Sequence, residues 1–489
     1  MFQKVAIANR GAVAVRLIST LREMGVESLL LCSEADLKLP YVGGASKVEV
    51  LGPAAPRESY LNQERVIQAA KKLKAEAIHP GWGFLSEDAE FARKVISEGL
   101  AFIGPSPECL AIMGHKVSAR KKMAELGLPI SPSTEELTGT PEEKAQKAKA
   151  IGFPLMIKPA GGGGGIGMIP VTDEEKLLKA LETAESQALR GFGSGSVYAE
   201  KLIVNPRHVE FQVVADKKGA ARHLWERDCS IQRRRQKILE EAGAPNIERA
   251  ALSAMAQKSA EVLSKLNYDH LGTVETLYDG ESGFNFLEVN PRLQVEHAVT
   301  EKVSGVNLVA AQIRLAMGEG VDEILSDYGW PPQPGSQAGL GSGSQAGHQP
   351  GSQAGLEKGP QGHALEARIY AEDPVRFLPS PGKITVFRPP AGRPGLTIIT
   401  PYGEGCEVTP FYDPMIAQVI VHTQDRLGSL KMMSEVLAEF EVAGIKTNIG
   451  FLRLMMEFGP YVAGNLHTGL ADELVASENY KARLEALKC

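Results

Sequence analysis

The alternation of apolar and polar positions in the first part of the chain predicts strands and helices that follow one another in turn. Val5–Ala8 and Ser28–Cys32 are apolar runs typical of buried strands, and a helical pattern separates them. The same order recurs between Gln63 and Gly104. Strands joined by helices favour an open parallel sheet, so residues 1–112 are expected to form an α/β domain.

A second block, residues 113–330, also begins its elements with recognisable signals. Thr140 can cap a helix while Glu143 closes a capping box, and Thr172–Glu175 offers another such box before an amphipathic helix. Between these two helices, Ile151–Lys158 has the pattern of a strand. The block is therefore expected to mix helices with strands.

The pattern changes at residues 331–361, where Gly-Ser-Gln-Ala-Gly occurs three times without charge or apolar periodicity. This composition predicts a flexible tether, because a Gly/Ser-rich coil of about 25 residues spans roughly 25–30 Å. A tolerated surface insertion is the simplest interpretation, and a function for the segment stays open. Short strands return over residues 362–489, with a helix expected at Leu427–Ala443, so this unit is expected to be mixed α+β.

The bulk composition limits the class of protein and its partners. The 489 residues are 43% hydrophobic and 23% charged, the balance of a globular chain with several domains. A net charge of −6 provides no broad basic surface, which argues against nucleic acid as a partner. No apolar run is long enough to cross a membrane, no targeting segment is visible, and the five cysteines are widely spaced. We therefore expect a cytoplasmic protein with no membrane partner.

A glycine-rich loop follows the strand that ends at Lys158. Positions 161–165 are all glycine, and a backbone without side chains can close over a polyphosphate and offer N–H donors. Lys158 would supply positive charge beside it. No Gly-Lys-Ser/Thr sequence follows, which excludes a P-loop. The loop could also be a plain linker, but the strands on both sides favour phosphate binding.

Alternating polar residues predict a metal site on a later strand. Glu288, Asn290 and Arg292 are two positions apart, so they are expected on one face of a strand. Carboxylate and amide oxygens suit Mg²⁺, and Glu275 on the preceding strand is a natural second carboxylate. The alternative is a solvated strand face, but the apolar neighbours indicate a half-buried setting.

Two clusters of charged residues occur in the same block of the sequence. Arg233–Arg235 with Lys237 form one, and the polar run Arg292–His297 forms the other. Such clusters either coat a surface or hold carboxylate and phosphate oxygens through guanidinium groups. The charges alone leave both interpretations open.

Longer motifs, occurring together and in order, resemble those of the ATP-grasp biotin carboxylases, which carboxylate biotin in biotin-dependent carboxylases. The resemblance covers nearly the whole chain. It rests on Ala8–Gly11, His79–Glu87, Met113–Lys116, the glycine loop, Pro206–Glu210, Glu226–Ser230, Gln294–His297 and Arg368–Pro374. It implies an ATP-grasp fold of α/β and α+β class. Its parts would be an N-terminal Rossmann-like parallel sheet domain (1–112), an ATP-grasp domain (113–330) with a mobile glycine-rich lid at about 131–203, and a C-terminal mixed α+β biotin carboxylase domain (362–489).

The resemblance also implies a ligase that uses ATP and two Mg²⁺ ions, or Mn²⁺, to carboxylate biotin with bicarbonate through carboxyphosphate. The residues implied for ATP are Lys116, Lys158, Gly164, Gly165, Glu200, Lys201, Leu202, His208, Gln232, Arg235, Glu275 and Glu288. Those implied for the metal are Glu275, Glu288 and Asn290, and those for bicarbonate are Lys237, Arg292, Gln294 and Val295. The implied catalytic residues are Arg292, Glu296, Lys237 and Arg368. Glu296 would be the general base, and Arg368 would bind biotin and stabilise its enolate.

The resemblance implies partners as well. Lys431-Met432-Met433 lies in a helical pattern and is not a biotinylation signal, so biotin is expected on a separate biotin carboxyl carrier protein. Carboxyltransferase subunits would complete the reaction, and a homodimer is expected. The sequence does not define the final carboxyl acceptor.

Two other functions fit parts of the sequence. Another ATP-grasp ligase, in which an amine captures an acyl phosphate, would share the nucleotide half but has no reason to carry His79–Glu87, Glu296 and Arg368 together. A catalytically silent nucleotide-binding regulator is the second. It is motivated by the insertion and by Ile166 and Arg235, which stand where the family usually has Arg and His.

Overall fold

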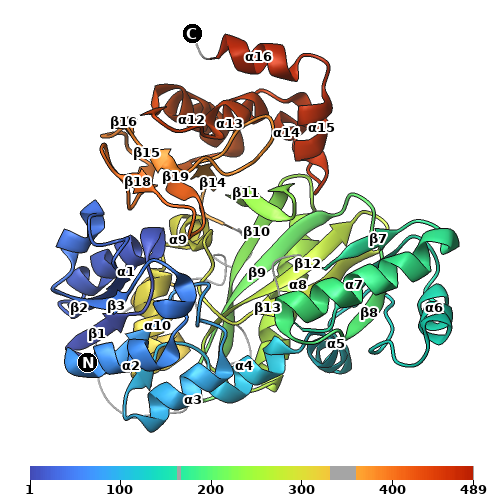
Figure 1. Cartoon of the computed structure of the whole chain (residues 1–489), viewed down its shortest axis with the longest axis horizontal. Helices are drawn as coiled ribbons and strands as arrows, with labels where there is room; N and C mark the ends of the chain where they lie inside the picture. The colour runs from blue at the N-terminus through green and yellow to red at the C-terminus, as the bar shows by residue number, and fades with distance from the viewer. Residues whose placement is uncertain (162–166, 331–359, 488–489) are drawn as a thin grey trace.

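The computed structural model describes residues 1–161, 167–330 and 360–487. Its strands form a parallel sheet near the N-terminus, a small antiparallel sheet, a long antiparallel sheet and two short two-stranded sheets (Figure 1). No helix in these ranges is long and apolar enough to cross a membrane. The four described cysteines, Cys32, Cys109, Cys229 and Cys406, are free thiols.

The N-terminal part is a five-stranded parallel sheet in the order β3-β2-β1-β4-β5. This confirms the predicted parallel sheet. Its strands are β1 (Lys4–Ile7), β2 (Glu27–Ser33), β3 (Lys47–Gly52), β4 (Ala77–His79) and β5 (Ala101–Phe102). The connecting helices are α1 (Gly11–Glu23), η1 (Pro40–Gly44), η2 (Pro56–Glu58), α2 (Gln63–Lys72), α3 (Ala89–Ser97) and α4 (Pro107–Gly114).

A smaller unit with its own apolar core contains a three-stranded sheet, ordered β7-β6-β8, and two helices that cover it. Its elements are α6 (Pro141–Lys149), β6 (Leu155–Pro159), β7 (Ile169–Val171), η3 (Glu174–Lys176), α7 (Leu177–Phe192) and β8 (Val197–Lys201). The predicted capping box of Thr140 and Glu143 is confirmed at the start of α6.

Two predictions for this unit are wrong. The strand expected at Ile151–Lys158 begins only at Leu155, because the residue before it is a proline and has no N–H to donate to a neighbouring strand. The second capping box does not form. The carboxylate of Asp173 accepts the hydrogen bond from the Lys176 amide, and the hydroxyl of Thr172 donates to Asp173 instead of capping.

The long sheet has eight strands in the order β13-β12-β9-β10-β11-β14-β19-β17. Figure 1 shows that it passes without a break from the central strands to the C-terminal ones. The strands are β9 (Arg207–Ala215), β10 (Ala221–Arg233), β11 (Gln236–Ala242), β12 (Leu271–Asp279), β13 (Gly283–Asn290), β14 (His363–Tyr370), β17 (Leu396–Ile399) and β19 (Met415–Thr423). The central helices are α5 (Lys116–Glu125), α8 (Arg249–Lys265), α9 (His297–Ser304), α10 (Leu308–Ala316) and α11 (Val321–Ser326).

Strand β9 has one face packed in the apolar core and one polar face. Val209, Phe211 and Val213 are buried in an apolar core that also contains residues of α8. The alternate residues of the strand, among them His208 and Glu210, point to the opposite face because side chains alternate along a strand. The polar face of the sheet is therefore held in place by an apolar core behind it.

The C-terminal part packs helices against the last strands of the long sheet. Its other elements are β15 (Gly382–Lys383), β16 (Val386–Arg388), β18 (Glu407–Val408), α12 (Arg426–Glu439), β20 (Glu441–Ala443), α13 (Ile449–Met456), α14 (Gly459–Val462), α15 (Leu470–Ala476) and α16 (Tyr480–Ala486). The helix predicted to reach Ala443 ends at Glu439. Phe440 is extended and its ring packs edge-on against Phe387, which directs residues 441–443 into pairing with β16.

A buried ionic cluster fastens α12 to the long sheet. Glu241 on β11 lies 2.6 Å from Arg426 and 2.9 Å from His363. Burial raises the pKa of the Glu241 carboxyl, but the hydrogen bond from His363 and the charge of Arg426 outweigh it and hold the pKa at about 2. A carboxyl whose pKa is lowered by folding stabilises the fold above its unfolded pKa and loses that contribution as the pH falls.

We therefore expect Glu241→Gln to destabilise the protein by about 3 kcal/mol at pH 7, as the linkage between pKa and stability requires. The difference from wild type should shrink as the pH falls from about 4.5 toward 2, because wild-type Glu241 is then protonated as well. Thermal unfolding at a series of pH values measures it. Glu441→Gln, which removes an exposed ion pair with Arg388, should change stability by less than about 1 kcal/mol at every pH.

Candidate active site

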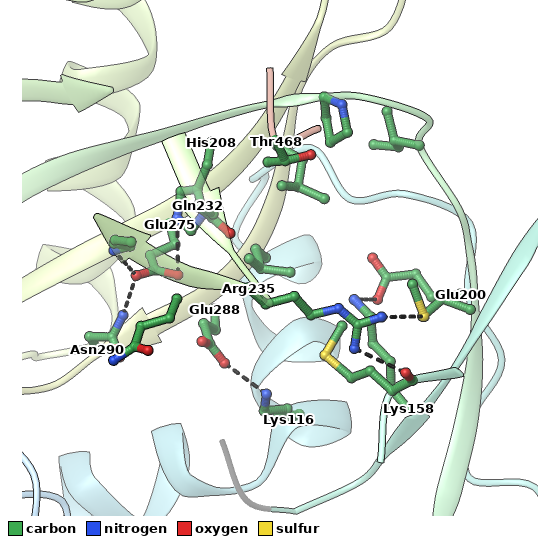
Figure 2. A pocket seen from close by; sticks show the side chains of 18 of the residues that line it. Lys116, Lys158, Glu200, His208, Gln232, Arg235, Glu275, Glu288, Asn290 and Thr468 are labelled. Carbon is green, nitrogen blue, oxygen red and sulfur yellow. Dashed lines mark hydrogen bonds and ion pairs between the residues drawn. The ribbon is translucent and has the colours of Figure 1, made fainter. Parts of the chain in front are cut away.

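A cavity of about 380 Å³ lies between the three-stranded sheet and the long sheet (Figure 2). Every predicted site residue that the structure describes lines this cavity: Lys116, Lys158, Glu200, Lys201, Leu202, His208, Gln232, Arg235, Lys237, Glu275, Glu288, Asn290, Arg292, Gln294, Val295, Glu296 and Arg368. Gly164 and Gly165 lie outside the described residues. The cavity thus brings together positions from the two sheets and from the first turn of α5.

Two lysine–glutamate pairs mark one end of the cavity. Lys116, at the start of α5, lies 2.9 Å from Glu288, and Lys158, at the end of β6, lies 2.7 Å from Glu200 (Figure 2). Burial lowers the pKa of Lys158, and the charge of Glu200 only partly offsets it. The amide of Lys116 also donates to the carbonyl of Ala160 at 3.1 Å, two residues after Lys158, so the two lysines lie near each other and a bound polyanion would meet both positive charges.

Two of the residues predicted to bind the nucleotide use polar groups for hydrogen bonds within the protein. The side chain of Lys201 donates to the carbonyl of Phe153 at 2.8 Å. The amide of Leu202 donates to the carbonyl of Pro154 at 3.1 Å. Both hydrogen bonds stabilise the end of β8. The other backbone atoms and the apolar atoms of these two residues line the cavity.

The side chains of the predicted basic cluster point to different places. Arg234 and Arg235 form the two-residue turn between β10 and β11, both with positive φ, as a type I′ turn requires. Arg233 pairs with Glu372 at 2.6 Å, away from the cavity. Arg235 instead extends across the cavity and donates to the carbonyl of Met168 at 2.9 Å, just beyond the glycine-rich loop (Figure 2).

The cavity also has an apolar wall that the sequence did not reveal. Met156, Met168, Ile203, Leu277 and Leu287 line it. Apolar residues on strands are indistinguishable in sequence from ordinary core residues, so no signal could have marked them as site residues. An apolar wall beside paired charges suits a ligand with a flat ring and a charged tail.

The predicted metal ligands converge on Glu275. Its Oε1 accepts hydrogen bonds from Asn290 at 2.7 Å and from Gln294 at 2.9 Å, and Glu288 is its direct cross-strand partner. Burial raises the pKa of Glu275, but Lys237 and His208 outweigh it and hold the pKa well below its usual value. The two carboxylates and one amide oxygen are hard donors, so these residues fit a magnesium ion.

Arg292 lies beyond the strand on which it was predicted. β13 ends at Asn290, because Pro291 cannot continue the pairing. Arg292 nevertheless turns back and donates to Asn290 Oδ1 at 3.0 Å, and its other side contacts Glu87 in an ion pair. Its side chain is 21% exposed, so it borders the cavity without facing open solvent.

Lys237 lies at the centre of a group of buried carboxylates in the cavity. Its ammonium lies 2.6 Å from Glu210, 2.8 Å from Glu275 and 2.6 Å from Glu296. Burial alone would lower the pKa of Lys237, but the three carboxylates raise it well above its usual value. Burial raises the pKa of Glu296, and Lys237 and Arg368 together lower it further than burial raises it. Both groups are therefore held in their charged forms.

The supporting role of one residue beneath these carboxylates was not predicted from the sequence. Arg227 is completely buried beneath the site and lies 2.5 Å from Glu210, with further hydrogen bonds to Gln212 and Thr300 at 2.8 Å each. It fixes the carboxylate that Lys237 needs. Its neighbours in the sequence, Glu226 and Asp228, are charged as well, so no local pattern marks Arg227 as a buried residue.

A second cavity, of about 390 Å³, adjoins the first and shares Gln236, Val295 and Arg368 with it. Its other walls come from the N-terminal part and from the loop before β19, and include Trp82, Phe84, Phe411, Tyr412 and Asp413. Arg368 therefore faces two spaces. Two separate ligands could meet at this residue.

Comparisons with known proteins agree with this architecture. The model of the biotin carboxylase N-terminal domain matches residues 1–110, and that of the biotin carboxylase C-terminal domain matches residues 366–473. Between them, the model of the carbamoyl-phosphate synthase L chain ATP-binding domain matches residues 115–324.

Two biotin carboxylases match this chain over nearly their whole length. A biotin carboxylase of Halalkalibacterium halodurans is 41% identical over 96% of this chain and 97% of its own, and biotin carboxylase 2 of Bacillus subtilis is 42% identical over 92% and 95%. The solved biotin carboxylase–beta-gamma-ATP complex of Campylobacter jejuni superposes with a TM-score of 0.86 at 37% identity and covers 99% of both chains. The biotin carboxylase domain dimer of Hydrogenobacter thermophilus 2-oxoglutarate carboxylase, with MgADP, ADP and bicarbonate, has a TM-score of 0.87 at 35% identity, covering 97% and 98%. With the parallel sheet, the cavity and these matches in agreement, the chain belongs to the biotin carboxylase family.

Proposed function

We propose that this protein is an ATP-dependent biotin carboxylase that uses bicarbonate to carboxylate biotin carried by a separate protein. The observation that carries the proposal is the position of Glu296. It contacts both Lys237 and Arg368, and Arg368 lines the two adjoining cavities. One cavity would hold nucleotide and bicarbonate, and the other would admit biotin.

ATP would lie along the first cavity. Its base would contact the apolar wall, and its phosphates would replace Glu200 and Glu288 as partners of Lys158 and Lys116. The glycine loop, including Gly164 and Gly165, would close over the phosphates as part of a lid at about residues 131–203. Glu275, Glu288 and Asn290 would hold two Mg²⁺ ions, which would neutralise phosphate charge. We also propose the division into domains at residues 1–112, 113–330 and 362–489.

Bicarbonate would be bound by Arg292, Lys237, Gln294 and the backbone of Val295. Glu296 is held ionised, so it can accept the bicarbonate proton, and the neighbouring cations lower the cost of forming the doubly charged anion. A carbonate oxygen would then attack the γ-phosphorus of ATP, with ADP as the leaving group, to form carboxyphosphate. The residues contribute mainly through position and charge.

Biotin would enter from the second cavity. Carboxyphosphate would break down to CO₂ and phosphate, and the phosphate would take the N1′ proton of biotin. Arg368 would stabilise the resulting enolate, whose nitrogen would attack CO₂. Biotin would arrive on a biotin carboxyl carrier protein, carboxyltransferase subunits would use the product, and the chain would act as a homodimer in the cytoplasm.

The proposal predicts ATP cleavage that depends on bicarbonate and is stimulated by free biotin. Glu296→Ala and Arg292→Ala should each lower the stimulated rate by at least about 100-fold, because one loses the base and the other a bicarbonate contact. Steady-state release of phosphate measures both. The matched controls Glu441→Ala and Arg388→Ala, at an exposed ion pair, should keep wild-type rates.

Other outcomes of this assay separate the alternatives. ATP cleavage that requires an amine and ignores biotin would indicate another ATP-grasp ligase. Nucleotide binding without cleavage would indicate a silent regulator. Wild-type rates in Glu296→Ala would overturn the site assignment.

The two lysines at the nucleotide end give a separate prediction. Lys116→Ala should weaken ATP binding by about tenfold to 100-fold, because a hydrogen bond to a charged group contributes about 1.5–3 kcal/mol. Titration calorimetry with ATP and magnesium measures the change. Lys121→Ala, on the exposed side of the same helix, should bind ATP like wild type.

A further inference from the structure

Two glutamates face each other behind Arg368 and have no role in the proposed reaction. Glu240 on β11 and Glu366 on β14 are direct partners in the register of these strands, and both are completely buried. Glu366 Oε1 accepts a hydrogen bond from Gln418 at 2.7 Å, while its Oε2 has no hydrogen-bond partner among the described residues. Two acids are thus enclosed side by side.

Glu240 shares Arg368 with Glu296. The same nitrogen, Nη2 of Arg368, lies 2.6 Å from Glu240 and 2.9 Å from Glu296. A register shift in the β10–β11 hairpin pairs Ile231 with Leu239 and Gln232 with Lys237, so Ile238 is an extra residue. An extra residue changes the side to which later side chains point, which places Lys237 and Glu240 on the same side of the strand. Glu296 therefore lies between two cations, one of which Glu240 also attracts.

Buried acids this close cannot both be ionised without a large cost. Burial raises the pKa of Glu240 to about 7 against the opposing charge of Arg368. Burial and the charge of Glu240 raise the pKa of Glu366 well above its usual value. One proton is therefore held on Glu366 near neutral pH, and Glu240 titrates in the same range.

The other groups near the pair do not titrate there. Arg368 on β14 and Lys237 on β11 remain cationic, since their pKa values are raised. Glu296, before α9, stays ionised because its pKa is lowered. Three further groups interact electrostatically with Glu240: Cys229 on β10, Tyr370 on β14 and Tyr461 on α14. Burial raises the pKa of each of them, so they remain neutral.

We propose that Glu240 and Glu366 are positioning residues that share one proton, and that ionised Glu240 draws Arg368 away from Glu296. This inference rests on the proposed function. With Glu240 ionised, Glu296 keeps a free oxygen for the bicarbonate proton, and Arg368 stays beside the second cavity. When Glu240 takes up a proton, Arg368 pairs with Glu296 alone and both are withdrawn from the reaction.

The sign of the pH dependence follows directly. Biotin-stimulated turnover should rise with pH as Glu240 loses its proton near pH 7, and it should fall below that pH. Glutamine resembles a protonated glutamate. It therefore imitates the normal state of Glu366 but the inactive state of Glu240.

The test compares Glu240→Gln with Glu366→Gln. Glu240→Gln should lower the biotin-stimulated kcat about tenfold at pH 8, abolish the rise near pH 7, and leave the KM for ATP unchanged. Glu366→Gln should keep the wild-type rate at pH 8 and keep the rise. Glu241→Gln, the adjacent buried glutamate, serves as the matched control because it loses stability but should retain the wild-type pH profile.

A second measurement does not depend on activity. At pH 8 the infrared spectrum should contain the carbonyl band of a buried protonated carboxylic acid in wild type and in Glu240→Gln, and that band should be absent from Glu366→Gln. Equal loss of turnover in both variants, an unchanged pH profile in Glu240→Gln, or a band that survives in Glu366→Gln would each overturn the inference. A wild type that shows the band but no biotin-stimulated cleavage would instead overturn the proposed function, and with it the catalytic role of the pair.

Discussion

The contact of one ammonium group with three buried carboxylates organises this site. Lys237 binds Glu210, Glu275 and Glu296, which come from β9, β12 and the segment before α9. Without the lysine, three carboxyl groups would be enclosed together, and removing one partner of a buried ion pair typically costs about 3–5 kcal/mol. A single side chain thus links a predicted metal ligand, the proposed base and the carboxylate of β9.

This coupling is possible because the site is built on strands. The alternate residues of β9 pack in the apolar core, so the carboxylates on the other face are fixed by the packing behind them. Arg227 adds a second layer of hydrogen bonds beneath Glu210 and Gln294. Charged groups held in this way do not need to reorganise when a charged ligand arrives, which is the condition for strong electrostatic catalysis.

Local patterns in the sequence predicted the parallel N-terminal sheet, the lysine before the glycine loop and the metal-ligand strand. The resemblance to biotin carboxylases, and not a local pattern, implied Lys116, Glu296 and Arg368. Period-two alternation predicted the shared face of Glu288 and Asn290, although not the end of the strand before Arg292. The apolar wall and Arg227 could not be assigned in advance, because their roles depend on which strands become neighbours. The early end of α12 likewise depends on Phe387, more than fifty positions earlier in the chain.

The long sheet has a consequence for how the chain acquires its structure. β11 pairs with β14, so that Leu239 meets Ala367, and this contact can form only after the intervening chain has been made. Until then β11 is an open edge with unpaired backbone groups, and such edges invite association with other chains. A nascent chain that stalls before β14 would therefore be prone to aggregate, and its rescue would depend on chaperones that cover this edge.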